Sequence, residues 1–156
     1  MKRMKFHAAR LVATALLLLV APAPSRLDVQ SSQLARLTVQ VTHARDAKGT
    51  IRVALFRSGE GFPGDTSKAL RAQAAQIDPK TLSGVIVFAG IPRGTYAVSV
   101  FHDENMNGKL DKNFVGMPKE GYGASNNPEK KMRAPTFEEA SFSLNRDQTV
   151  EIKLMY

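Results

Sequence analysis

The chain has 156 residues, a formal net charge of +8, and neither cysteine nor tryptophan. The lack of cysteine argues against a disulfide-stabilised scaffold and against a bacterial lipoprotein, which carries a cysteine at its processed N-terminus. The positive charge gives little support to nucleic-acid binding, because part of it belongs to a basic N-terminal segment that we expect to be removed.

The first 25 residues have the three-part composition of a secretory signal peptide. Residues 1–10 carry four basic side chains and no acidic one, residues 11–21 form an apolar run, and small residues follow up to Ser25. An apolar run of this length is shorter than the ~20 residues that a membrane-spanning helix needs. We therefore expect cleavage near residue 25, no transmembrane helix in the processed chain, and a periplasmic or secreted protein.

Signal removal also changes the charge. The loss of four basic residues leaves 18 basic side chains against 14 acidic ones, so the net charge falls from +8 to +4. We expect residues 26–35 to form a flexible lead-in and residues 36–156 to form one domain, since about 130 residues suffice for a hydrophobic core without disulfides.

Alternation of apolar and polar residues predicts half-buried strands through most of this domain. The run at 84–91 is almost continuously apolar and predicts a central strand. The predicted strands are 36–44, 50–57, 84–91, 95–103, 139–145 and 149–156.

Residues 68–77 fit two structures. Their alanine content favours a short helix, whereas their position between strands favours a strand paired with residues 84–91. We favour the strand, so the fold class is all-β, a seven-stranded antiparallel sandwich of the immunoglobulin-like kind.

Three local features accompany the strands. Tyr96 follows a Pro-x-Gly turn, the position of a tyrosine corner, in which the hydroxyl ties back to the chain. Residues 112–136 lack periodicity, and their apolar residues favour one long ordered loop packed on a sheet edge. The spacing of Thr136 and Glu139 predicts a capping box and one helical turn.

Residues 103–111 have the ligand order of a calcium-binding loop. Carboxylate and amide side chains occupy alternate positions, a glycine follows where the backbone must turn, the next residue offers its carbonyl, and a further carboxylate follows two residues later. The predicted ligands of a Ca²⁺ ion are Asp103, Asn105, Asn107, Lys109 through its carbonyl, and Asp111.

The loop departs from an EF-hand. Phe114 stands where an EF-hand has a bidentate glutamate, and a strand precedes the loop instead of a helix, so we expect an affinity of only ~10⁻⁴–10⁻³ M. Asn, Asp and Gly are also the preferred residues of ordinary turns. A polar turn that binds no ion therefore remains an alternative.

Three blocks of this chain resemble a known family. They are GTYAVSVFHDENMNGKLD (94–111), GMPKEGYGASNN (116–127) and PTFEEASF (135–142), which are similar to the bacterial domain of unknown function 2141. The resemblance extends from about Leu37 to Tyr156. It implies an exported β-sandwich related to transthyretin-like and Cna-B-like modules, and it implies no established activity.

The function that we expect first is a non-enzymatic binding or interaction module of the cell envelope. Aromatic rings beside amide and hydroxyl groups suit a saccharide, a peptide or a protein as the ligand. The candidate ligand-binding residues are Phe114, Glu120, Tyr122, Ser125 and Asn126.

Two alternatives stay open. One is a hydrolase that uses His102 and Ser125, although the sequence around Ser125 is not a nucleophile elbow. The other is a structural or assembly protein without ion or ligand, in which the last strand pairs with a partner chain across a free edge.

Overall fold

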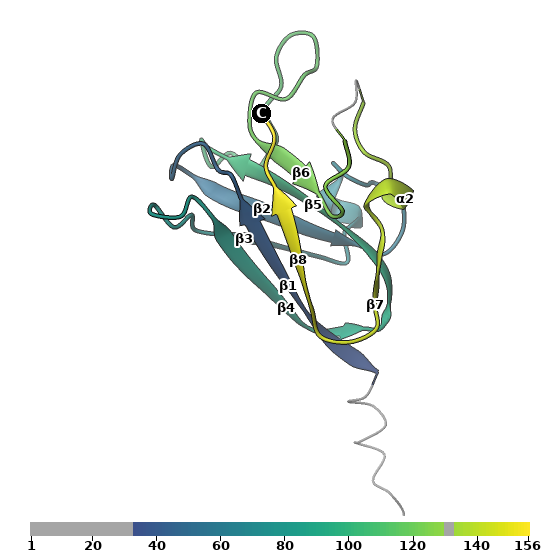
Figure 1. Ribbon diagram of the computed structural model, residues 1–156. Coiled ribbons are helices and arrows are strands. Elements are labelled where there is room, and N and C mark those ends of the chain that lie inside the picture. Colours follow the sequence, from purple (N-terminus) through teal and green to yellow (C-terminus); the bar gives the residue numbers. More distant parts are fainter. Residues whose placement is uncertain (1–32, 130–132) are drawn as a thin grey trace, which may run out of the picture.

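The computed structural model describes residues 33–129 and 133–156. The predicted signal peptide and residues 26–32 of the predicted lead-in lie outside this range. The chain forms two β-sheets that pack face to face (Figure 1). The all-β sandwich is therefore confirmed, and the first strand begins at Leu34, two residues before the predicted boundary.

The smaller sheet has three strands in the order β4-β1-β8. They are β1 (Leu34–Thr42), β4 (Gly84–Pro92) and β8 (Gln148–Lys153). β1 pairs antiparallel with β4 and parallel with β8. The sandwich is thus not wholly antiparallel as predicted, because β1 and β8 come from opposite ends of the domain and run in the same direction.

The larger sheet has the order β3-β2-β5-β6, and a further short strand, β7, pairs with the start of β5. Its strands are β2 (Thr50–Phe56), β3 (Arg71–Ala75), β5 (Gly94–Asp103), β6 (Tyr122–Ala124) and β7 (Phe142–Leu144). Two short helical segments lie outside the sheets, η1 (Thr66–Lys68) and α2 (Phe137–Ala140). The described residues form one strand more than the seven predicted. The additional strand is β6, which the aperiodic sequence around it did not predict.

The core lies between the sheets and is built by the alternation that predicted the strands. Leu37, Val39 and Val41 of β1 face Ile51, Val53 and Leu55 of β2, and all six are at most 1% exposed. Because alternate residues of a strand point to opposite faces, Arg52, Ala54 and Phe56 of β2 point away from this core, to the outer face of the larger sheet.

Two strand predictions need correction. Residues 71–75 do form a strand, but it pairs with β2 and not with residues 84–91, so β3 and β4 lie in different sheets. β4 is an edge strand instead of a central one. Val85 and Val87 lie on its outer face and are 54% and 45% exposed, so its apolar run does not reflect burial on both faces.

Two of the three local predictions agree with the structure, the tyrosine corner and the capping box. The Tyr96 hydroxyl donates a 2.7 Å hydrogen bond to the carbonyl of Pro92, and the ring is fully buried. Thr136 and Glu139 form the predicted capping box at the start of α2. This helical turn occupies the first residues of the predicted strand 139–145, which therefore begins at Phe142.

Candidate functional site

The outer face of the larger sheet carries an open groove of about 890 Å³. Its volume lies within the range of roughly 300–1,000 Å³ that is typical of ligand sites. The groove lies between the loop that follows β2 and the long segment that joins β5 to β6, with the sheet itself as its floor.

One row of the floor is aromatic and basic. Arg52 pairs in register with Ala74 on one side and with Phe101 on the other, and Phe101 pairs with Tyr122. Residues directly opposite each other on paired strands point to the same face. Phe101 therefore lies on the floor between Arg52 on one side and Tyr122 on the other.

The next row contains small side chains. Ala54 pairs with Ala72 and with Ser99, and Ser99 pairs with Ala124. Short side chains leave depth above the sheet, which is why a groove forms here. The Ser99 hydroxyl donates a 2.8 Å hydrogen bond to the carbonyl of Pro63 and so fixes the loop that forms one end of the groove.

Beyond this loop the outer face is covered by a second, smaller apolar cluster. Phe62 packs edge-on against Phe56 at 5.3 Å and against Phe137 of α2 at 6.0 Å between ring centroids. Ala97 and Ala140 are buried beneath these rings. The cluster closes one half of the sheet face and leaves the other half as the groove.

The walls of the groove are predominantly basic. Among the described residues that line it, four carry a positive charge and Asp65 carries the single negative one. Arg52 is paired with Asp103 and Arg133 with Glu139. Lys109 and Lys112 are exposed and make no ion pair with any residue that the structure describes. The wall formed by 108–118 therefore carries these two positive charges against one carboxylate, that of Asp111, which bonds to the Asn105 and Asn107 amides.

Asp103 lies at the root of this wall, at the end of β5, and is fully buried. One carboxylate oxygen accepts from the backbone N–H of Asn107, and the other accepts from Arg52 Nε and the N–H of Gly108, each at 2.9 Å. The carboxylate therefore ties the loop to β2 and closes its turn.

The other predicted ion ligands converge on one another. Asn105 Nδ2 donates to one oxygen of Asp111 at 2.8 Å, and Asn107 Nδ2 donates to the other at 3.0 Å. The amide oxygens accept backbone N–H groups, those of Asn107 and Lys109. Amide N and O are assigned from this hydrogen-bond network, so an ion would require both amides to turn over and to give up these backbone bonds.

Glu120 completes the loop from the opposite side. It is 4% exposed, and its two carboxylate oxygens accept the N–H groups of Glu104 and Asp111, each at 2.9 Å. This residue joins the two ends of the loop, so its place in the structure is that of a brace and not of a groove-lining group.

The remaining candidate ligand-binding residues are dispersed. Tyr122 lines the groove. Ser125 is buried, and its hydroxyl bonds to the N–H of Val98 and the carbonyl of Ala140. Asn126 donates to the carbonyl of Ser141, and Phe114 is fully exposed at the end of a projecting loop, so the segment 112–118 is not packed down as the sequence suggested.

His102 and Ser125 do not meet. Ser125 bonds to Val98, four residues from His102 along β5, which corresponds to roughly 13 Å at the rise of a strand. His102 Nε2 donates to the carbonyl of Lys48 at 2.6 Å, and Nδ1 accepts from the Tyr156 hydroxyl at 2.8 Å. Burial raises the pKa of the Tyr156 phenol, so the phenol stays protonated as a donor.

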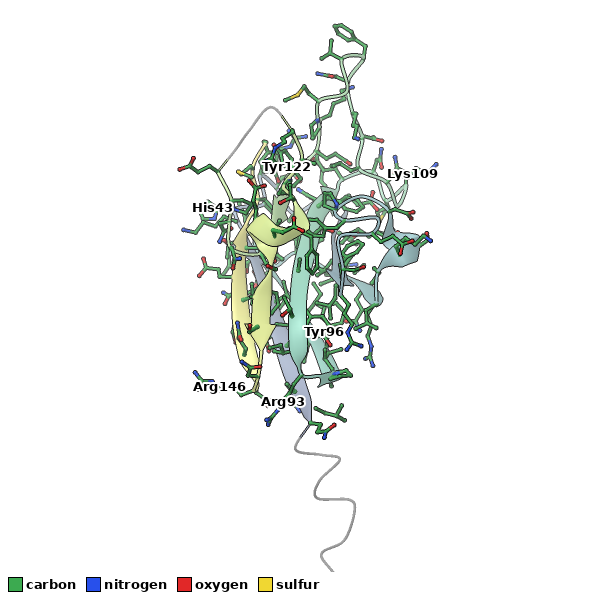
Figure 2. The ribbon with its side chains drawn as sticks, turned by 90° about the vertical axis from the view of Figure 1, so that its right-hand side faces the viewer. His43, Arg93, Tyr96, Lys109, Tyr122 and Arg146 are labelled. Atoms are coloured by element: carbon green, nitrogen blue, oxygen red, sulfur yellow. The ribbon has the colours of Figure 1, made fainter. Side chains whose placement is uncertain are left out.

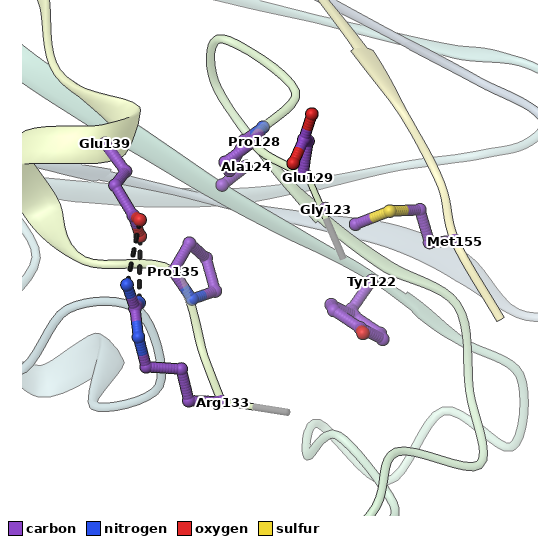
Figure 3. Close-up of a pocket in the computed structure, with 9 residues that line it drawn as sticks. All are labelled: Tyr122, Gly123, Ala124, Pro128, Glu129, Arg133, Pro135, Glu139 and Met155. Carbon is purple, nitrogen blue, oxygen red and sulfur yellow. Dashed lines mark hydrogen bonds and ion pairs between the residues drawn. The ribbon is translucent and has the colours of Figure 1, made fainter. Parts of the chain in front are cut away.

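A cavity of about 10 Å³ lies next to the groove, between β6 and the segment 133–135. Figure 3 shows Arg133 turned toward Glu139, with Tyr122 and Met155 on the far side of the cavity. The two guanidinium–carboxylate bonds of 2.8 and 2.9 Å tie this segment to α2. The space is close to that of a single water molecule, roughly 10–15 Å³, so the larger groove is the candidate ligand site.

The free edge of β8 is partly covered by a side chain. Asn127 donates from Nδ2 to the carbonyl of Glu151 at 3.0 Å and accepts at Oδ1 from the N–H of Lys153 at 2.8 Å. An amide that bonds in this way takes the place of a neighbouring strand. The covered groups weaken the alternative that this edge recruits a partner chain.

The sequence pattern did not single out Arg52 or Phe101 as site residues. The alternation pattern could have identified them, since both occupy outward positions on strands whose alternate residues lie in the core.

No helix among the described residues is both long enough and apolar enough to cross a bilayer.

Comparison with known proteins gives one match. The model of a family described as uncharacterised protein conserved in bacteria, DUF2141, matches residues 39–153, which include both sheets, the groove and the loop 103–111. No curated protein and no protein of solved structure matches the chain.

Proposed function

The chain belongs to the DUF2141 family of bacterial proteins, and from this premise we propose that it is an exported, non-enzymatic module that binds an extended, anionic ligand of the cell envelope. The groove on the larger sheet carries this proposal. The composition of residues 1–25 supports export to the periplasm or the exterior.

The shape and the charge of the groove favour this class of ligand. A floor of small side chains beside two aromatic rings accepts a narrow chain that lies along the sheet and stacks on Phe101 and Tyr122. Lys109 and Lys112 place positive charge along one wall, which selects carboxylate or phosphate groups. Acidic glycan strands and acidic peptides both have these properties.

We propose binding without catalysis because the polar side chains near the groove are engaged in holding the protein's own backbone in place. Asp103 and Glu120 are saturated with hydrogen bonds from the loop, and Ser125 is buried away from the groove. A nucleophile with a base in reach would require His102 beside Ser125, and the two are held apart on the sheet.

A ligand titration tests the groove. We expect tetragalacturonate and hexaglutamate, added to the ¹⁵N-labelled protein, to shift the amide signals of residues 52–54, 72–74 and 99–101. Ala72→Trp fills the floor and weakens binding by at least about tenfold, which is the loss of roughly 1.4 kcal/mol. Val85→Trp, on the outer face of the other sheet, serves as the matched control and leaves binding unchanged.

Two outcomes would contradict the groove. One is the absence of any amide shift with either acidic probe. The other is a set of shifts confined to residues outside the groove, with Ala72→Trp binding as tightly as the unmodified protein.

We further propose that the loop 103–111 binds Ca²⁺ weakly and thereby fixes the basic wall of the groove. The convergence of Asn105, Asn107 and Asp111 supports this component, because their side chains already face one another. Turned over, the two amides offer oxygens beside the Asp111 carboxylate, and hard cations prefer such oxygen ligands.

Thermal melting tests the ion. We expect millimolar Ca²⁺ to raise the melting temperature above its value in chelator, because an ion that binds only the folded state stabilises it. Asp111→Ala removes the convergent carboxylate and abolishes the increase. Asp65→Ala, whose carboxylate caps η1 on the opposite wall, is the control that keeps it. Identical melting in Ca²⁺, Mg²⁺ and chelator would leave an ordinary polar turn.

A further inference from the structure

The segment 112–118 forms a small projecting loop, which we call the finger. It leaves the end of the sandwich between β5 and β6 (Figure 1). A bridge between Lys112 and Pro118 closes its base. Phe114 is 100% exposed at the tip, Val115 is 65% exposed and Met117 is 38% exposed.

Four backbone N–H groups of the finger donate to acceptors within it. The side-chain oxygen of Asn113 accepts hydrogen bonds from the backbone N–H groups of Val115 and Met117. The backbone carbonyl of Asn113 accepts from the N–H of Gly116, and the backbone N–H of Asn113 donates to the carbonyl of Met117. A loop closed in this way holds its apolar tip outward without relying on the sheets. These bonds also reduce the number of unsatisfied N–H groups, which lowers the cost of entering a medium without water.

Lysines surround the base of the finger. Lys109, Lys112 and Lys119 are exposed, and none makes an ion pair with a residue in the described part of the chain. Figure 2 shows Lys109 at the same end of the molecule as Tyr122, opposite Arg93 and Arg146. Asp111 and Glu120, the nearest acids in sequence, accept hydrogen bonds from N–H groups of residues 104–111 and form no ion pair with these lysines.

From this arrangement we propose that the finger docks the protein on a bilayer rich in anionic lipid. The phenyl and aliphatic side chains enter the interface between headgroups and acyl chains, and the three lysines contact the phosphates. A convex apolar tip with a basic collar fits a membrane surface, whereas a protein partner would need a matching pocket. This inference does not depend on a ligand in the groove.

The test uses the absence of tryptophan from the chain. In the full-length protein, Phe114→Trp places a single tryptophan at the tip, and the emission of this tryptophan reports only on its own surroundings, whatever the N-terminal segment does. Val85→Trp, at a position that is 54% exposed on the smaller sheet, is the matched control. The probes are vesicles of phosphatidylcholine alone and of phosphatidylcholine with phosphatidylglycerol in a molar ratio of about 3:1, chosen for their surface charge.

We expect the emission of Phe114→Trp to move to shorter wavelength on the anionic vesicles and to be quenched by brominated acyl chains, while that of Val85→Trp stays unchanged. Replacing Lys109, Lys112 and Lys119 by glutamine in the Phe114→Trp protein lowers its partitioning onto anionic vesicles by roughly 100-fold. Raised salt lowers the partitioning of the Phe114→Trp protein that keeps the three lysines.

Unchanged emission of Phe114→Trp on anionic vesicles would overturn the proposal. Equal insertion into neutral vesicles, or insertion that survives loss of the three lysines, would overturn the recognition of anionic lipid. An emission shift that depends on protein concentration in the absence of vesicles would show instead that two copies meet through the finger.

Discussion

Replacing Asp103 by alanine is expected to lower the free energy of unfolding by about 3 kcal/mol. The carboxylate is fully buried and accepts hydrogen bonds from Arg52, Asn107 and Gly108. Alanine leaves the N–H of Gly108 without a partner, leaves the N–H of Asn107 with the Asn105 side chain as its acceptor, and releases the loop from β2. The Arg52 side chain is 39% exposed, so it regains water, and the loss stays below that of a fully buried ion pair.

Urea unfolding of matched variants checks this expectation. Asp103→Asn keeps the size of the side chain and one acceptor oxygen, so its loss is intermediate. Asp111→Ala removes a carboxylate of the same loop that bonds only to exposed amides, so its loss is less than about 1 kcal/mol. Equal losses at Asp103 and Asp111 would contradict the role of Asp103 as the anchor of the loop.

The role of Asp103 shows where sequence reasoning ends. Its place in the repeat of acidic and amide residues predicted an ion ligand, because the residues that define that pattern are neighbours in the chain. Its ion-pair partner Arg52 is 51 residues away and comes from the pairing of β2 with β5. A pattern within one loop carries no information about that register.

Features whose partners are close in sequence were predictable. Tyr96 bonds to a carbonyl four residues earlier, and Thr136 bonds to an N–H three residues later. The sandwich followed from the period of two along each strand. The parallel pairing of β1 with β8 was not predictable from that period, because alternation fixes which face a residue occupies and not which strand lies beside it.

The groove was missed for a related reason. Arg52, Phe101 and Tyr122 lie in three strands, and their order in the sheet decides that they share one row. The outward phase of Arg52 and Phe101 was visible in the sequence, but the sequence did not show that the loop after β2 covers one half of the face and leaves the other half open. Conversely, the apolar run 84–91 predicted burial on both faces, although the outer face of β4 has no layer above it among the described residues.

Replacing Gly49 by alanine is the other substitution for which we expect a large loss of stability, because two stretches of backbone approach closely at this residue. Gly49 immediately precedes β2 and has φ +66°. A Cβ at this position would overlap the carbonyl oxygen of Asp103 and lie 2.7 Å from the Cα of Glu104. Neither backbone atom can rotate away as a side chain does. The obstruction falls where β5 ends and the loop 103–111 begins.

Gly90→Ala provides the matched control for Gly49→Ala. Gly90 has nearly the same φ, +67°, but an added Cβ there meets no atom within 4 Å. Gly90→Ala is therefore expected to lose about 1–2 kcal/mol from the left-handed backbone alone, and Gly49→Ala about 3–4 kcal/mol once the overlap is included. The difference between the two, measured from urea midpoints, isolates the cost of the close approach. Equal losses would mean that the turn before β2 moves freely away from Asp103, and that the root of the basic wall is less firmly held than its hydrogen bonds indicate.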